Sequence, residues 1–443
     1  MSHVLRPSLS ASLTLLCVAG VLLRVVFLVV VPVVPISDFA RYMEVATNVA
    51  NGSGLSVSGA PFISQPPLYP GLLGAWLSLF GVHIIAAKAL NLLLSASTLA
   101  LWAWACPRTG MRPGWQMASL AVLAFHPALV AYTGLLGTET LAIFLAVLAF
   151  ALTTLPMRAA MPALLGIVLA LVALNRPQLL PLPVGLVIGV LLGRGGWSRM
   201  RSCLVMLVAF VVLLLPWIMR NERLFDRVVP VSANSGYVLL VNNNALNQTG
   251  NWMPLSQVPL SDHDRQRFQG EAGVPMSFFS EGDEDAKILQ WTPAADGVAR
   301  SVALDWMRQH PGQALHLAML RLETSLDPAT LMYWPLIDFG GAPRWLEWLV
   351  GGLNLMLVLL AAFGALQLLP QVRQLTLTQL MALGTVVLGA LSIALFEGQG
   401  RYLIPLVPAM LILAGGRSSG SGTAIRAGAG HAGAGFGKVS STS

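Results

Sequence analysis

The stretch SASLTLLCVAGVLLRVVFLVVVPVVPISDFARYM, residues 10–43, sets the fold class of this chain. It opens with an apolar run over residues 10–34, in which Arg24 is the only charged residue. A run of this length can cross a bilayer as a single helix. Asp38, Arg41 and Tyr42 follow almost at once. Because a carboxylate beside a membrane costs free energy unless it is paired or serves a site, the stretch predicts a first membrane span and raises the question of what Asp38 does at its end.

The composition extends this prediction to the whole chain. Of 443 residues, 56% are hydrophobic and 10% are charged, and the mean hydropathy is +0.72. A soluble domain carries about 25% charged residues. Backbone polar groups in lipid must be satisfied within each segment, which favours helices. We therefore expect an all-α polytopic membrane protein. The formal charge of +7 reflects arginine-rich membrane edges and not nucleic-acid binding.

Apolar runs separated by short polar breaks predict about ten transmembrane helices. The predicted spans are 10–34, 83–105, 115–133, 139–156, 161–174, 178–193, 203–219, 345–369, 375–396 and 402–416. Segment 66–81 is short and led by prolines, so we expect an interfacial or re-entrant helix there. If residue 1 is cytoplasmic, the cytoplasmic ends carry arginines and a lysine but no acid, which fits the positive-inside rule. This topology predicts an integral plasma membrane protein, in a bacterium the inner membrane.

The acidic residues mark the opposite face. Fourteen of the nineteen acids lie between residues 220 and 343. The other five are placed at or near ends that the topology makes extracytoplasmic; they are Asp38, Glu44, Glu139, Glu347 and Glu397. The sequence thus gathers its membrane-proximal carboxylates on the side that ATP and nucleotide-sugars do not reach.

These patterns divide the chain into four parts. Residues 1–219 form an N-terminal transmembrane module whose first extracytoplasmic loop is 35–65. Residues 220–343 turn polar and rich in Asn, Gly and Pro, and predict a small extracytoplasmic region of mixed α/β structure, with a helix over 299–326 broken near Pro311. A second transmembrane module, 344–416, follows. The Gly/Ser/Ala-rich tail, 417–443, is expected to be a disordered cytoplasmic segment.

Two carboxylates are the main candidates for chemistry. Residues 37–50 are amphipathic and predict a surface helix on which Asp38 and Tyr42 share a face, begun by Ser37 or Asp38 as N-cap. We place Arg41 elsewhere on that helix and assign it no role. Asp38 either only caps the helix or also faces a site. Glu139, at the start of a long apolar run, is either a first-turn acid favoured by the helix dipole or a residue of a cavity near Asp38.

Basic residues of the same face are Lys88, Arg176, Arg220 and Arg401. Arg401 could form a structural ion pair with Glu397, or these arginines could bind an anion, since guanidinium groups suit phosphate. The histidines show no metal-binding spacing, and no phosphate-binding or hydrolase motif stands in a usable context. We therefore expect that no cofactor is required, although a divalent metal is compatible with the pattern.

Several motifs together resemble a known family. An aspartate opens the first outside loop, a helix ending in a Gly-x-Gly turn follows, and PPLYP comes next; the further matches are GLLGTETL (134–141), LNRPQLLPLP (174–183), the stretch 215–244, QHPGQALHLAMLRL (309–322) and GRYLIPLVPAMLILA (400–414). Their order resembles that of the GT-C membrane glycosyltransferases, in the branch of the protein O-mannosyltransferases and aminoarabinose transferases. The resemblance covers nearly the whole chain to about residue 416.

The resemblance implies an inverting enzyme that transfers one sugar from a polyprenyl-phosphate donor to an acceptor hydroxyl outside the cytoplasm. The acceptor is a glycan, a lipid or a protein. It implies that Asp38 is the general base, that Glu139 is a second acidic site residue, and that Arg401 and Tyr402 lie near the donor phosphate. Many relatives carry a cation before Pro-Pro, where this chain has Gln65.

The contact that this cation makes to the donor phosphate is therefore either missing here or made by Lys88, Arg176 or Arg220. A transporter or lipid flippase remains the alternative outside the enzymes, although it predicts acids near mid-membrane and two related halves. An enzyme that transfers a diphosphate-linked glycan is the alternative within them.

Overall fold

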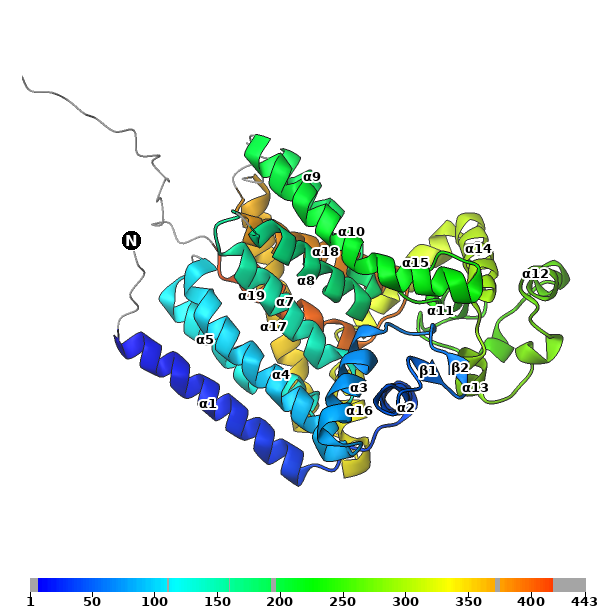
Figure 1. Cartoon of the computed structure of the whole chain (residues 1–443), viewed down its shortest axis with the longest axis horizontal. Coiled ribbons are helices and arrows are strands. Elements are labelled where there is room, and N and C mark those ends of the chain that lie inside the picture. The colour runs from blue at the N-terminus through cyan, green and yellow to red at the C-terminus, as the bar shows by residue number, and fades with distance from the viewer. Residues whose placement is uncertain (1–6, 110, 159, 193–196, 371–374, 417–443) are drawn as a thin grey trace, which may run out of the picture.

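The computed structural model describes residues 7–109, 111–158, 160–192, 197–370 and 375–416, and these are almost wholly α-helical. The predicted tail 417–443 lies outside the described residues. A bundle of helices runs through the molecule, with α1 along one edge (Figure 1). Its members are α1 (Pro7–Val30), α4 (Ile84–Ala105), α5 (Pro113–Phe125), α6 (Pro127–Ala131), α7 (Thr138–Thr153), α8 (Met161–Asn175), α9 (Leu182–Leu192), α10 (Trp197–Phe225), α17 (Arg344–Leu368), α18 (Leu377–Leu395) and α19 (Val407–Ala414).

The other elements lie between these bundle helices in the chain. They are α2 (Ser37–Ala50), α3 (Leu68–Phe80), α11 (Ser235–Asn242), α12 (Asp262–Ala272), α13 (Glu284–Leu289), α14 (Pro293–Gln309), α15 (Pro311–Thr324), α16 (Pro328–Leu336), and the short 3-10 turns η2 (Pro177–Leu179), η7 (Gly400–Tyr402) and η8 (Ile404–Leu406). Strands β1 (Ser56–Val57) and β2 (Ala60–Pro61) form one antiparallel hairpin, with Ser56 opposite Pro61.

The helices have the lengths and composition of a polytopic membrane protein. Within the described residues, five helices are long and apolar enough to cross a membrane, and they are Ser10–Val30, Ile84–Thr109, Met200–Phe225, Arg344–Leu368 and Leu377–Leu395. Every predicted span contains a helix, but the remaining ones are shorter, so the total of ten crossings stays a prediction. The predicted span 115–133 is two helices, because Pro127 lacks the N–H that would continue α5 and begins α6 instead.

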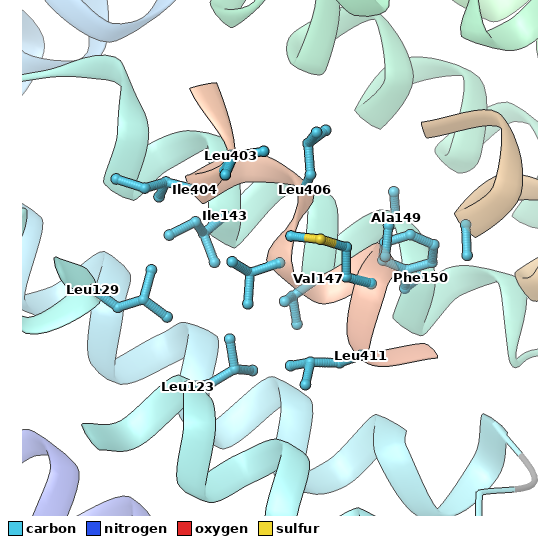
Figure 2. Close-up of a cluster of buried hydrophobic side chains, with 14 of the residues drawn as sticks. Leu123, Leu129, Ile143, Val147, Ala149, Phe150, Leu403, Ile404, Leu406 and Leu411 are labelled. Carbon is cyan, nitrogen blue, oxygen red and sulfur yellow. The ribbon is translucent and has the colours of Figure 1, made fainter. Parts of the chain in front are cut away.

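Helix α7 is the centre of the bundle. Its side chains are almost all buried, whereas α1 exposes Val29 and many other apolar residues on its outer face. Val147 and Phe150 of α7 lie against Leu406 and Leu411 of the C-terminal segment in the apolar core (Figure 2). Because α7 is enclosed by other helices, the acid in its first turn is placed inside the protein and away from lipid.

The region 220–343 is helical, which corrects the expectation of mixed α/β structure. Within the described residues the only strands are those at 56–61, and α11–α14 gather at one end of the bundle around a core of their own (Figure 1). The Asn-rich stretch forms local turns instead of strands: the Asn247 side chain accepts hydrogen bonds from the N–H groups of Thr249 and Gly250, at 3.1 and 2.7 Å. The helix break near Pro311 is confirmed, since α14 ends at Gln309 and α15 begins at Pro311.

Candidate active site

A cavity of about 360 Å³, lined by both charged and apolar side chains, lies where several bundle helices end. It is bounded by the first turns of α2 and α7, the end of α8 with η2, the end of α18 with η7 and η8, and the segment 230–238. Eight of the ten residues predicted for the site line it, namely Asp38, Tyr42, Gln65, Glu139, Arg176, Glu397, Arg401 and Tyr402. Residues up to 363 positions apart in the chain therefore meet in one place.

Asp38 is directed into this cavity and does not cap its helix. The N-cap of α2 is Ile36, which makes no side-chain capping bond, so the prediction of a Ser37 or Asp38 cap is wrong. Oδ1 of Asp38 accepts hydrogen bonds from Gln65 Nε2 at 2.6 Å and from an Arg41 nitrogen at 3.1 Å. Oδ2 faces the two terminal nitrogens of Arg401, each at 3.4 Å. One carboxylate oxygen is thus firmly held, and the other has only long contacts.

Glu139 and Arg176 form a second ion pair deeper in the protein. Their atoms lie 2.8 Å apart, with 4% and 9% of the respective side chains exposed. Arg176 is placed there because Pro177 forces the preceding residue out of helical geometry, which ends α8 and turns Arg176 towards α7. The neighbouring Asn175 donates to the Thr138 carbonyl at 3.0 Å and so joins the end of α8 to the start of α7.

The third group of charges follows α18. The Tyr402 hydroxyl donates to Glu397 at 2.6 Å, and Gln399 Nε2 donates to the same carboxylate at 2.6 Å. The guanidinium groups of Arg176 and Arg401 lie over the Tyr402 ring, at 5.8 and 5.4 Å from its centroid. The structural Glu397–Arg401 ion pair considered above is not among the ion pairs of the described residues, since Arg401 pairs with Asp38.

Tyr42 lines the cavity one turn after Asp38. Burial raises the pKa of its hydroxyl, and the charges of Asp38 and Glu139 raise it further. The phenol therefore stays protonated at neutral pH and can act only as a neutral hydrogen-bond donor or acceptor. Its ring packs edge-on against Tyr69, with centroids 5.9 Å apart.

Unsatisfied polar atoms concentrate in the cavity. Buried side-chain atoms without a partner are rare in folded proteins, and each calls for an explanation. Among the described residues, six such atoms belong to residues that line the cavity, namely Gln65 Oε1, Glu139 Oε2, Asn175 Oδ1, Arg176 Nε, Gln178 Oε1 and Arg401 Nε. Both donors are guanidinium nitrogens. A ligand with hydroxyl groups and an anionic oxygen would complement this set.

Two predicted residues lie elsewhere. Lys88 and Arg220 are not among the described residues that line the cavity. Arg220 donates to the carbonyls of Leu55 and Phe62, each at 3.1 Å, and so attaches the hairpin loop to α10. Lys88, on α4, faces the charge of Asp338. Of the three cations considered for the phosphate, only Arg176 reaches the cavity.

The sequence analysis also missed residues of the site. Arg41 is buried, and it contacts Asp38 and, at 2.7 Å, Asp285 of α13, so its placement away from Asp38 was wrong. A spacing of three residues from Asp38 was the available signal, since such pairs are neighbours on a helix. The polar lining residues that were not predicted are Thr138, Asn175, Gln178, Ser232, Asn234, Ser235, Arg300 and Ser392. No group of three or more His, Cys, Asp or Glu residues suited to a metal occurs in the described part of the chain.

The helical bundle, with a cavity at the ends of its helices, has a fold that is also found among solved structures. No protein-family model and no curated protein matches the sequence. Among solved structures, the fold is similar to that of the archaeal oligosaccharyltransferase AglB from Archaeoglobus fulgidus in complex with an inhibitory peptide and a dolichol-phosphate, with a TM-score of 0.52, 12% identity, and coverage of 92% of this chain and 50% of AglB.

This chain therefore spans half the length of AglB. A second similar structure is ArnT from Cupriavidus metallidurans bound to undecaprenyl phosphate, with a TM-score of 0.43, 14% identity, and coverage of 91% of this chain and 77% of ArnT.

Proposed function

We propose that this protein is a membrane glycosyltransferase that moves one sugar from a polyprenyl-phosphate donor to an acceptor hydroxyl, with inversion at the anomeric carbon and with Asp38 as general base. The observation that carries the proposal is the asymmetry of the Asp38 carboxylate. Oδ1 is held at 2.6 Å by Gln65, whereas Oδ2 has only 3.4 Å contacts to Arg401. Oδ2 is the oxygen that is available to accept a proton.

The donor phosphate needs cations, and two of the three arginines that line the cavity have a nitrogen free to bind it. Arg401 and Arg176 each have a buried Nε without a partner. A polyprenyl phosphate is already a good leaving group, so the site needs no acid to protonate it, only positive charge to hold the departing oxygen. Phosphate oxygens suit the guanidinium fork. When Arg401 turns its nitrogens to the phosphate, Oδ2 of Asp38 loses its only contacts and becomes free for the acceptor.

The reaction then balances as one displacement. The acceptor oxygen attacks the anomeric carbon from the face opposite the phosphate, and its proton passes to Asp38 Oδ2. The bond between the anomeric carbon and the phosphate oxygen breaks, and the polyprenyl phosphate leaves with the extra negative charge beside Arg401 and Arg176. A positioned base contributes about 10²–10⁴-fold to such a step.

The size of the cavity supports a single sugar. Its volume of about 360 Å³ is at the lower end of the range for small-molecule sites, roughly 300–1,000 Å³. A long diphosphate-linked glycan requires a more extended groove. The dolichol-phosphate in the similarly folded AglB fits a lipid-linked phosphate as the donor. We further propose that the cavity faces the extracytoplasmic side of a bacterial inner membrane, because that orientation places the arginine-rich ends in the cytoplasm.

The test uses the purified full-length protein in detergent or liposomes with a panel of polyprenyl-phosphate sugars labelled in the sugar. Wild-type protein should release polyprenyl phosphate and form a product of inverted anomeric configuration. Asp38→Asn should lower kcat by at least about 10²-fold, since an amide cannot take the proton. Asp305→Asn is the matched control, because Asp305 pairs only with the exposed Arg308 outside the cavity.

Two results would overturn the proposal. One is transfer by Asp38→Asn at the wild-type rate, which would remove Asp38 as the base. The other is transfer directly from a nucleotide-sugar by sealed vesicles supplied only on the cytoplasmic side, which would contradict both the donor and the orientation of the site.

A further inference from the structure

Arg321 of α15 is a fully buried cation outside the cavity. Its Nε donates to the Gly250 carbonyl at 2.7 Å, and its terminal nitrogens donate to the carbonyls of Asn242, Ala394 and Leu395 and to Asn243 Oδ1. No carboxylate within ion-pair distance of it occurs among the described residues. Burial lowers its pKa to about 10, so the side chain remains charged at neutral pH.

Its partners are the ends of two helices. Asn242 is the last residue of α11, and Ala394 and Leu395 are the last residues of α18. The final carbonyls of a helix have no intrahelical partner and carry the negative end of the helix dipole, which is where a cation is favoured. Arg321 therefore joins the C-terminal ends of α11 and α18 through one guanidinium group.

Both helices form walls of the cavity. Helix α11 begins at Ser235, which lines the cavity, and ends on Arg321. Helix α18 contributes Ser392, ends beside Arg321, and leads into the segment 396–402, which carries Glu397, Arg401 and Tyr402. Arg321 thus joins two elements that each contribute residues to the lining of the cavity.

Two further contacts hold the segment 396–402 close to Arg321 and the end of α11. Asn242 Nδ2 donates to the Phe396 carbonyl at 2.6 Å. Gly398 lies so close to α15 that a Cβ atom there would be 2.3 Å from the Arg321 carbonyl oxygen. Only glycine fits at this distance. The segment 396–402 therefore lies close to the backbone of Arg321 as well as to its guanidinium group.

We propose that Arg321 is a positioning residue that sets the spacing between α11 and the segment 396–402 and thereby places Arg401 and Tyr402 for the transfer reaction. The kinetic part of this inference rests on the proposed function; the structural part does not. Arg321 does not line the cavity, so it acts through the backbone that it holds. Misplacing catalytic groups by about 1 Å can cost about 10²-fold in rate.

The chain supplies a matched control for a merely structural arginine. Arg24 of α1 is also buried and donates to Ser95 Oγ at 2.6 Å and to the carbonyls of Leu123 and Ala124, near the end of α5. Like Arg321, it bonds to carbonyls near a helix end, but α1, α4 and α5 contribute no described residue to the lining of the cavity, whereas α11 and α18 do. Substitution of either Arg24 or Arg321 should lower the stability of the protein. Only substitution of Arg321 should also misplace the residues of the cavity.

The first measurement is hydrogen exchange of backbone amides in full-length Arg321→Gln, Arg321→Lys and Arg24→Gln, each purified as folded protein. We expect exchange in 396–403 and 235–242 to become at least about tenfold faster in Arg321→Gln, as the loss of about one buried charged hydrogen bond predicts. Arg24→Gln should leave both segments unchanged and affect α5. Unchanged exchange in 396–403 of Arg321→Gln would overturn the proposal whether or not any sugar is transferred.

The second measurement is steady-state transfer per folded protein. Arg321→Gln should lower kcat by about 10²-fold with a smaller change in the donor KM, and Arg321→Lys should recover part of that loss because it keeps the charge. An equal loss of kcat in Arg24→Gln would overturn the positioning role. If wild-type protein transfers no sugar from any donor, the proposed function fails, and the exchange measurement still decides the role of Arg321.

A third variant keeps the inference testable if Arg321→Gln does not fold. Gly398→Ala leaves the Arg321 side chain in place but forces the segment away from α15, because the added methyl collides with backbone. It should speed exchange in 396–403 and lower kcat in the same way as Arg321→Gln. Wild-type exchange and kcat in Gly398→Ala would contradict the proposal.

Discussion

The buried pair of Glu139 and Arg176 should be strongly coupled in stability. The two side chains are 2.8 Å apart and almost fully enclosed. At an effective dielectric constant of about 20, opposite charges about 4 Å apart attract by about 4 kcal/mol. Removing one member of such a pair also leaves the other charge buried and uncompensated, which typically costs about 3–5 kcal/mol. Glu139→Gln and Arg176→Gln should therefore each lower the free energy of unfolding by about 3–5 kcal/mol.

The double variant separates this reasoning from simple loss of contacts. Two neutral amides leave no uncompensated charge, so Glu139→Gln/Arg176→Gln should cost less than the sum of the single substitutions, with a coupling of about 0.5–3 kcal/mol. All three variants should transfer sugar poorly, because each loses at least one charged group of the cavity. A double variant that is stable but inactive would show that the pair serves the site as well as the fold.

The assay can use the cysteines of the chain. Cys106 is fully buried, whereas Cys17 and Cys203 are partly exposed. In a Cys17→Ser/Cys203→Ser background, labelling of Cys106 reports unfolding along a denaturant titration in mixed micelles. Asp305→Asn is again the control, because the Asp305–Arg308 pair has a similar length of 3.0 Å but is exposed, and such pairs contribute about 0.2–1 kcal/mol. If Glu139→Gln costs no more than Asp305→Asn, the buried pair is screened by water and the reasoning is refuted.

Two further predictions concern residues at and outside the cavity. Tyr42→Phe keeps the ring contact with Tyr69 and removes only the hydroxyl, so kcat/KM should fall by up to about tenfold, as for one hydrogen bond of about 0.5–1.5 kcal/mol. The free energy of unfolding should stay unchanged. A loss of activity as large as that of Asp38→Asn would give the hydroxyl a direct part in the chemistry. Lys88→Gln should leave donor KM and kcat within about twofold in the same transfer assay, because Lys88 does not line the cavity; a large rise in donor KM would show that the lysine reaches the phosphate.

Much of the fold follows from local signals. Apolar runs of the right length predicted each bundle helix, and Pro311 predicted the break between α14 and α15. The region 220–343 was harder, because its turn-rich composition is shared by strands and by short helices. There, Asn side chains bond to nearby backbone, and Asp296 accepts hydrogen bonds from the N–H groups of Gly236 and Tyr237 across the region. Such contacts depend on the tertiary fold and leave no periodic pattern in the sequence.

The site was predictable in part for a similar reason. Charges at the ends of apolar runs share one level of the membrane, and this property identified Asp38, Glu139 and Arg401. A position at the membrane edge does not tell which of these charged residues come together in one cavity. Arg300 reaches the cavity from a helix that begins far from any membrane span, and only the packing of α14 on α11 brings it there.

The angular position of a residue around its helix gives part of the information that its depth in the membrane does not. With about 3.6 residues per turn, each residue is rotated by about 100° from the one before it. Tyr42 comes four residues after Asp38 and is thus displaced from it by about 40° around the helix axis. Arg41 comes three residues after Asp38 and is displaced by about 60° in the other direction. Both therefore belong to the face of Asp38. Glu44, six residues on, is displaced by about 120°, and it accepts a hydrogen bond from the Ser58 N–H of the hairpin instead of entering the cavity. The two acids of α2 therefore divide by the side of the helix on which they stand, and the same rule, applied to Arg41, assigns it to Asp38 from the sequence alone.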